Sequence, residues 1–194
     1  MGDIAGCEVS AGFDERVSLA VALQARQQFA TLEQWLYSDE ARRMDLRGIE
    51  LGEELRGREL LRLMLQAHIN SRGDGDVGPA IRVRNNDAML WYAHKRLHSR
   101  RFLTIFGEVF VKRVGYGMAG ETGIHPLDEQ LQLPARSYSY EVQRRLVKKS
   151  IQGPFAEAVE AIDEMTGVKV PQRSAEEIVI DASVDFDSYY AARQ

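Results

Sequence analysis

Residues 71–79, SRGDGDVGP, constrain the fold more than any other segment of the chain. Three glycines, two aspartates and a proline in nine residues favour a loop or linker over the interior of a helix or strand. This loop separates a front with helical periodicity from a region of short, strand-like segments. A chain divided in this way predicts a mainly α fold of the α+β class, with a small β-hairpin module.

Two stretches before the loop repeat apolar residues at intervals of three and four, which is the spacing of an amphipathic helix. The first runs from about Asp14 to Tyr37 and the second from about Ile49 to Asn70. A glycine inside a helix costs about 1 kcal/mol relative to alanine, so Gly57 predicts a break in the second stretch. The two helices can pair as an internal antiparallel hairpin or with a second copy of the chain, and both interpretations stay open here.

Short antiparallel strands are expected after the loop. Residues 81–84 and 89–93 have the composition of two strands around a turn, and residues 102–106 and 109–114 have that of a hairpin. Gly107-Glu108 suits a type II′ turn, because glycine supplies the positive φ that the first central position needs.

The C-terminal part returns to helical spacing and predicts a helix-turn-helix. Ser139 is a suitable N-cap for a helix over residues 140–152, which Gly153-Pro154 ends. An apolar stripe from Phe155 to Met165 marks the next helix, which Gly167 ends. Pro171 opens a last helix, whose apolar face comprises Ala175, Ile178, Val179, Ala182, Phe186 and Tyr189. A short helix, a glycine turn and a second amphipathic helix are typical of this motif.

These patterns divide the chain into four expected segments. They are a helical N-terminal region at 1–72 that could dimerise, a basic β-hairpin module at 80–117, a connector at 118–137, and a three-helix region with the helix-turn-helix at 138–194.

The charge of the chain is unevenly distributed. The formal net charge is −4, but residues 1–70 carry −4, residues 71–150 carry +6 and residues 151–194 carry −6. A basic middle between acidic ends forms a local positive potential that could attract phosphate groups. The distribution is also compatible with proteins that never bind DNA.

The turn before the last helix and its first residues are candidates for reading DNA bases. In a helix-turn-helix the N-terminal turn of the second helix meets base edges in the major groove, which selects Lys169, Gln172 and Arg173. Arginine can bond bidentately to guanine and glutamine to adenine. An ordinary helical hairpin packed in a core is the alternative, and acidic residues later in the helix would repel phosphate.

Two further basic groups are candidates for contacting the DNA backbone, which positions a protein without reading sequence. On the helix over 140–152, residues four apart form adjacent basic ridges, namely Arg144, Lys148, Arg145 and Lys149. In the hairpin the candidates are Arg100, Arg101, Lys112 and Arg113, interleaved with aromatic residues as on some nucleic-acid surfaces. A solvated helix face and an aromatic hairpin core are the alternatives.

The sequence predicts no catalytic residue, no bound metal and no cofactor. The histidines lack the cysteine and carboxylate spacing of a metal site, and no phosphate-binding or nucleophile motif is present. Because no apolar run reaches the length of a membrane span, we expect no membrane partner. A single cysteine, Cys7, fits a reducing cytoplasm.

Five short motifs follow one another in a specific order. They are GRELLRLMLQAHI at 57–69, T-x-F-G-E-V-x-V-x-R-x-G-Y at 104–116, H-P-L-D-x-x-L-x-L-P at 125–134, T-G-V-x-V-x-x-R at 166–173 and F-D-x-Y-Y-A-A-R at 186–193. This series resembles the N-terminal half of bacterial insertion-sequence transposases of the Kra type, distant relatives of the Mutator-like group.

The resemblance implies a DNA-binding fragment that recognises the terminal inverted repeats of a mobile element in double-stranded DNA. In such transposases an RNase H-like domain follows, whose Asp, Asp and Glu hold two divalent metals. That domain would begin beyond Gln194, so the chain is expected not to be an enzyme. A homodimer or the full-length transposase is the implied protein partner. The alternatives are a protein–protein or oligomerisation module and a decayed remnant without function.

Overall fold

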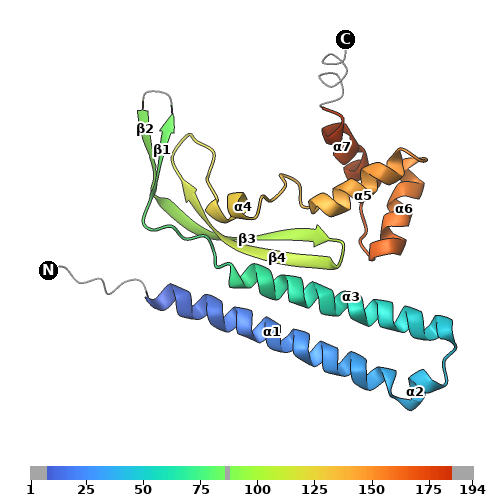
Figure 1. Ribbon diagram of the computed structural model, residues 1–194. Helices are drawn as coiled ribbons and strands as arrows, with labels where there is room; N and C mark the ends of the chain where they lie inside the picture. The colour runs from blue at the N-terminus through green and yellow to red at the C-terminus, as the bar shows by residue number, and fades with distance from the viewer. Residues whose placement is uncertain (1–7, 86–87, 185–194) are drawn as a thin grey trace, which may run out of the picture. The chain divides into compact units, whose positions relative to one another are not determined.

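The computed structural model of the chain describes residues 8–85 and 88–184 (Figure 1). The fold is mainly α, with two two-stranded antiparallel sheets among the described residues, as the sequence predicts. The chain divides into two compact units. Unit 1 holds the residues up to Arg101 together with Val109–Leu133, and unit 2 holds Phe102–Glu108 together with the residues from Pro134.

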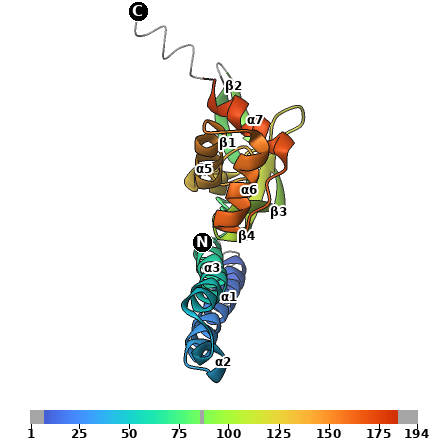
Figure 2. The same ribbon diagram turned by 90° about the vertical axis from the view of Figure 1, so that its right-hand side faces the viewer.

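Two long antiparallel helices dominate unit 1 (Figures 1 and 2). They are α1 (Glu8–Leu36) and α3 (Leu46–Ser71), joined through the short α2 (Asp39–Arg42). The side chain of Asp45 caps α3 by accepting a hydrogen bond from Gly48 N at 2.8 Å. The internal hairpin is therefore formed, and both helices begin earlier than expected.

The helix α3 continues past Gly57 without the break that the sequence predicts. A methyl group at Gly57 would meet no atom within 4 Å, whereas one at Gly52 would lie 2.4 Å from the indole ring of Trp35. That indole is only 7% exposed, and the guanidinium of Arg56 stacks 4.0 Å from its centroid. Gly52 is thus present because the Trp35 ring from α1 lies directly on the α3 backbone.

The strands after the loop are longer than the sequence predicts. Antiparallel β1 (Ile81–Asn85) and β2 (Ala88–Tyr92) pair so that Ile81 lies opposite Tyr92. The second sheet pairs β3 (His94–Thr104) with β4 (Gly107–Gly117), and its turn is Ile105-Phe106 instead of Gly107-Glu108. Gly107 takes a φ of 119° just after the turn, and there it provides the positive φ expected of glycine.

The loop at residues 71–79 is bound to β4 through the buried side chain of Tyr116. The Tyr116 hydroxyl lies 2.6 Å from the Asp76 carboxylate and accepts a hydrogen bond from Val77 N at 3.0 Å. Lys95 also bonds to Asp76, and these hydrogen bonds, that of Lys95 first, lower the pKa of Asp76 to about 2. The loop predicted from Gly, Asp and Pro content is confirmed, and it is ordered by these contacts.

Unit 2 is a cluster of three helices, α5 (Tyr140–Ser150), α6 (Phe155–Thr166) and α7 (Gln172–Ala182) (Figures 1 and 2). Ser139 caps α5 by accepting a hydrogen bond from Val142 N, and Gly167 ends α6 with a left-handed φ of 66°, as predicted. The buried core of the cluster comprises Val142, Leu146, Ala158, Ile162, Val168, Val170, Ala175 and Ile178.

The apolar face predicted for the last helix is only partly buried. Ala182 is exposed, and Phe186 and Tyr189 lie outside the described residues, as does the motif at 186–193. Two helices joined by residues 167–171 match the element order of the predicted helix-turn-helix. That they act as one on DNA stays a prediction.

We expect the substitutions Gly52→Ala and Gly57→Ala to change stability in opposite directions. Gly52→Ala forces the Trp35 ring out of its position and should lower the free energy of unfolding by about 1–3 kcal/mol. Gly57→Ala removes only the conformational freedom of glycine and should raise the free energy of unfolding by about 0.5–1 kcal/mol. Urea unfolding followed by circular dichroism measures both, and a stabilised Gly52→Ala variant would contradict the contact with Trp35.

Candidate nucleic-acid interface

The N-terminal end of α7 presents the three residues predicted to read bases, and all three are exposed. The side chain of Arg173 is 90% exposed and makes one long contact, 3.4 Å, from Nε to the Glu177 carboxylate. Gln172 donates to the Glu176 carboxylate at 3.2 Å, and Lys169 lies in the turn between α6 and α7. An exposed side chain with weak contacts of this kind loses little when it turns toward a ligand.

The polypeptide that carries these residues is held firmly. Val168 and Val170 flank Lys169 and are buried in the core of unit 2, and Ala175 and Ile178 bury the inner face of α7. A small displacement of α7 would therefore open space in a packed core. The three exposed side chains extend from a rigid support.

Arg136 is a residue that the sequence analysis did not identify. Its guanidinium donates to the Glu177 carboxylate at 2.7 Å and also bonds to Asp181. The hydrogen bond from Arg136 lowers the pKa of Asp181, and the guanidinium partly compensates the negative charge on this side of α7. Nothing in the local sequence signals this pairing, because Arg136 lies 41 residues from Glu177 in the chain.

The two arginines of α5 share one carboxylate. Arg144 binds Glu141 through two hydrogen bonds of 2.7 and 2.8 Å, and Arg145 binds the same group at 2.9 Å. Hydrogen bonds from Arg144 and then from Arg145 lower the pKa of Glu141 to about 2. Lys148 is exposed and Lys149 half-buried, and neither has an ion-pair partner within residues 8–85 and 88–184. Of the four predicted phosphate contacts, the two arginines are therefore paired with a carboxylate and, within the described part of the chain, the two lysines are not.

The hairpin residues fall into two pairs. Arg101 and Lys112 are exposed, as surface contacts require. The side chains of Arg100 and Arg113 are only 18% and 13% exposed and both lie against Asp128, which belongs to the short helix α4 (Pro126–Gln130). These two arginines therefore attach α4 to the hairpin, and we leave them out of the proposed phosphate contacts. The helix α4 lies within the segment 118–137 that the sequence analysis assigned to a connector.

Three histidines line an open cleft of about 400 Å³ on the same hairpin, together with Arg96. The rings of His98 and His125 stand edge to face with centroids 5.5 Å apart. A methyl group at Gly115 would lie 2.8 Å from His125 Nε2, so only glycine admits both rings. Burial lowers the pKa of His125, and electrostatic repulsion from its basic neighbours, first of all Arg113, lowers it further.

The described residues contain neither a candidate metal site nor a candidate membrane-spanning helix. Within residues 8–85 and 88–184, no three side chains of His, Cys, Asp or Glu gather in a way that could hold a metal ion. No described helix combines the length and the apolar composition of a membrane span.

We expect the folded chain to lose stability between pH 7 and pH 5 through His125. Because the pKa of His125 is lower in the folded state, the unfolded chain binds a proton at this residue at a higher pH than the folded chain does. Below the ordinary histidine pKa of 6.5 the free energy of unfolding therefore decreases as the pH is lowered, by at most about 1.4 kcal/mol per pH unit for one group. Asp76 and Glu141, with pKa values of about 2, lose their contribution only at lower pH.

Urea unfolding of the wild type and of His125→Gln at several pH values in this range measures the effect. His68→Gln, at an exposed position of α3, controls for the loss of one imidazole. An equal pH slope in the wild type and in His125→Gln would show that His125 is not the group involved.

Comparisons with protein-family models, with curated proteins and with solved structures find no match to this chain.

Proposed function

We propose that this chain is the DNA-binding region of a transposase and recognises the terminal inverted repeats of a mobile element in double-stranded DNA. The observation that carries the proposal is the N-terminal end of α7, where exposed polar and cationic side chains extend from a helix anchored in the core of unit 2. The ordered series of motifs that resembles Kra-type transposases supports the same function.

Base recognition is assigned to Lys169, Gln172 and Arg173. The guanidinium of Arg173 can form two hydrogen bonds to guanine, and the amide of Gln172 can form two to adenine. Both side chains contact glutamates of α7, and those contacts would be exchanged for base edges. The bonds from Arg136 to Glu177 and Asp181 reduce the repulsion between the rest of α7 and phosphate.

Backbone contacts are assigned first to Lys148 and Lys149 of α5. Arg144 and Arg145 contribute as well, because two arginines against one Glu141 leave an excess positive charge. Arg101 and Lys112 of the hairpin remain candidates for further contacts. We propose no catalytic role for the residues of this interface.

Two substitutions separate base reading from backbone contact. Arg173→Ala should cost about 1–3 kcal/mol of binding free energy and relax the preference at one base position. Lys148→Ala should weaken binding to all sequences about equally, and should reduce the slope of log affinity against log salt by about 1.

The measurement uses the purified chain and a pool of duplexes with randomised sequence. Duplexes enriched by binding are compared with scrambled duplexes by fluorescence anisotropy at two salt concentrations. Arg47→Ala, which removes one charge at an exposed position of α3, is the matched control and should bind as the wild type does. Failure to enrich any sequence, together with affinity that does not depend on salt, would refute DNA binding.

A further inference from the structure

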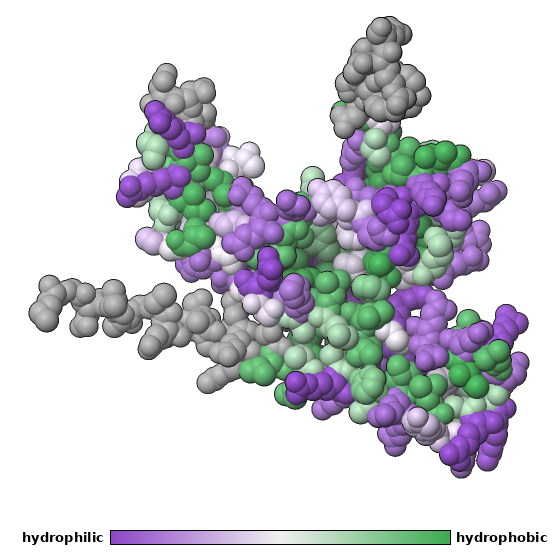
Figure 3. All heavy atoms as spheres, in the orientation of Figure 1, coloured by the Kyte–Doolittle hydropathy of each residue, from purple (hydrophilic) through white to green (hydrophobic). Residues whose placement is uncertain are grey.

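The paired helices α1 and α3 leave much of their apolar surface uncovered. Among their described side chains only Ala25, Trp35 and Gln66 are buried. Large apolar side chains that are 45–56% exposed include Leu19, Leu23, Phe29, Leu61 and Met64. Figure 3 shows such hydrophobic surface over the two helices. A helix pair with apolar residues on both its inner and its outer sides is typical of a larger bundle.

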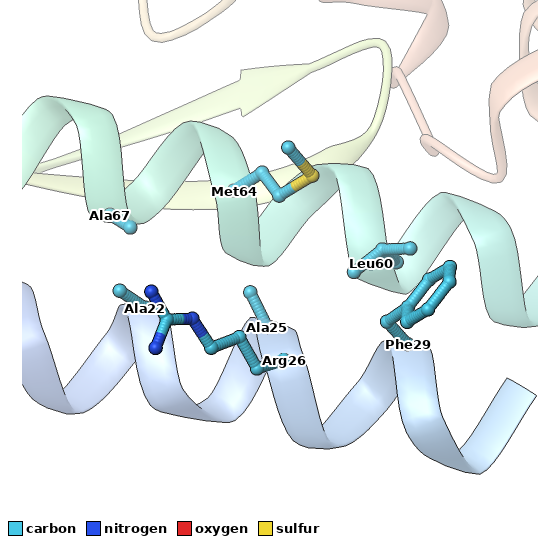
Figure 4. Close-up of a pocket in the computed structure, with 7 residues that line it drawn as sticks. All are labelled: Ala22, Ala25, Arg26, Phe29, Leu60, Met64 and Ala67. Atoms are coloured by element: carbon cyan, nitrogen blue, oxygen red, sulfur yellow. The ribbon is translucent and has the colours of Figure 1, made fainter.

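An open groove of about 460 Å³ runs along one side of the seam between the two helices (Figure 4). Phe29 of α1 and Leu60 of α3 stand beside each other at one end, and Ala22, Ala25 and Ala67 line the rest together with Met64 and Arg26. Small residues beside large ones let an opposing helix approach closely and interdigitate.

Two opposite charges on α1 lie in the groove and just beyond its Phe29 end. Arg26 lines the groove, and Glu33 follows seven residues later, two helical turns along the same side. Both are exposed, and neither side chain has an ion-pair partner within residues 8–85 and 88–184. The midpoint between them falls between Phe29 and Ala30, at the end of the groove that Phe29 lines.

This arrangement is self-complementary. If a second α1 lies antiparallel on the first, about a twofold axis through that midpoint, each Arg26 lies opposite Glu33 of the partner subunit. A twofold interface requires one patch that is complementary to itself, and an apolar centre flanked by one cation and one anion at equal distances meets that requirement.

We propose that a second copy of this chain occupies the groove. The two α1 helices pack antiparallel about a twofold axis at Phe29 and Ala30, and the two helical hairpins form a four-helix bundle. The exposed apolar side chains supply most of the binding free energy, and the two Arg26–Glu33 pairs select the antiparallel alignment. The proposal rests on unit 1 and does not depend on the DNA-binding role of unit 2.

Charge reversal at these two positions tests the proposal in the full chain. Arg26→Glu places glutamates opposite each other and Glu33→Arg places arginines opposite each other. Each single variant should therefore dimerise at least about tenfold more weakly than the wild type. The double variant Arg26→Glu/Glu33→Arg restores opposite charges and should recover dimerisation. An equimolar mixture of the two single variants should form a heterodimer.

Sedimentation velocity at several protein concentrations measures the species, and circular dichroism verifies that each variant keeps its helices. Arg47→Glu and Glu40→Arg reverse charges at exposed positions outside the groove and should dimerise as the wild type does. A wild-type chain that is monomeric at all concentrations would overturn the proposal. So would a dimer that both single reversals leave unchanged, or single variants that stay apart when mixed.

The two proposals fail separately. Arg173→Ala affects DNA binding and should leave the dimer intact, whereas Arg26→Glu affects the dimer and should leave each monomer able to bind one DNA site. A wild-type chain that dimerises but binds no DNA would therefore overturn only the proposed function.

Discussion

The side-chain amide of Gln66 joins the helices of unit 1 to its β-hairpin. Its Nε2 donates to Phe110 O, and its Oε1 accepts from Phe110 N, both at 2.8 Å. The amide also donates to Asn70 Oδ1 at 2.8 Å, and the residue is only 8% exposed. A buried amide left unpaired costs about 1–3 kcal/mol, so this pairing fixes α3 against β4 at a single alignment.

A second constraint is the way in which carboxylates select among the cations. Asp128 engages Arg100 and Arg113, and Glu141 engages Arg144 and Arg145. Arginine forms bidentate bonds with carboxylates, whereas lysine is a compact and strongly hydrated charge, which suits arginine to sharing Asp128 and Glu141. The basic middle of the chain is thus less available to phosphate than its net charge suggests. Arg136 has the opposite effect on α7, where it compensates two acidic residues.

The two proposals assign different tasks to the two units. Unit 2 would read DNA with exposed side chains at the start of a helix whose inner face is buried, and unit 1 would bring two copies together through exposed apolar surface. A twofold dimer presents two equivalent reading helices, and an element with two inverted ends offers two equivalent sites. The match between these symmetries gives a physical reason for both functions to occur in one chain.

Features governed by neighbouring residues were predictable from the sequence. The Gly, Asp and Pro loop at 71–79, the Ser139 cap and the end of α6 at Gly167 depend on backbone conformation and on hydrogen bonds a few residues away. The helical periodicity before the loop and after Ser139 identified the long elements for the same reason.

Features governed by distant contacts were decided by the tertiary structure. The helix α3 continues through Gly57, Gly52 is explained by the Trp35 ring, and the hairpin turn lies two residues before its predicted place. Arg100 and Arg113 pair with Asp128 of α4 and so hold α4 against the hairpin. Arg136 pairs with Glu177 and Asp181 and so compensates negative charge on α7. Local spacing determines which helix or strand a residue joins, but the partner of a charged or aromatic side chain depends on which segments the folded chain brings together.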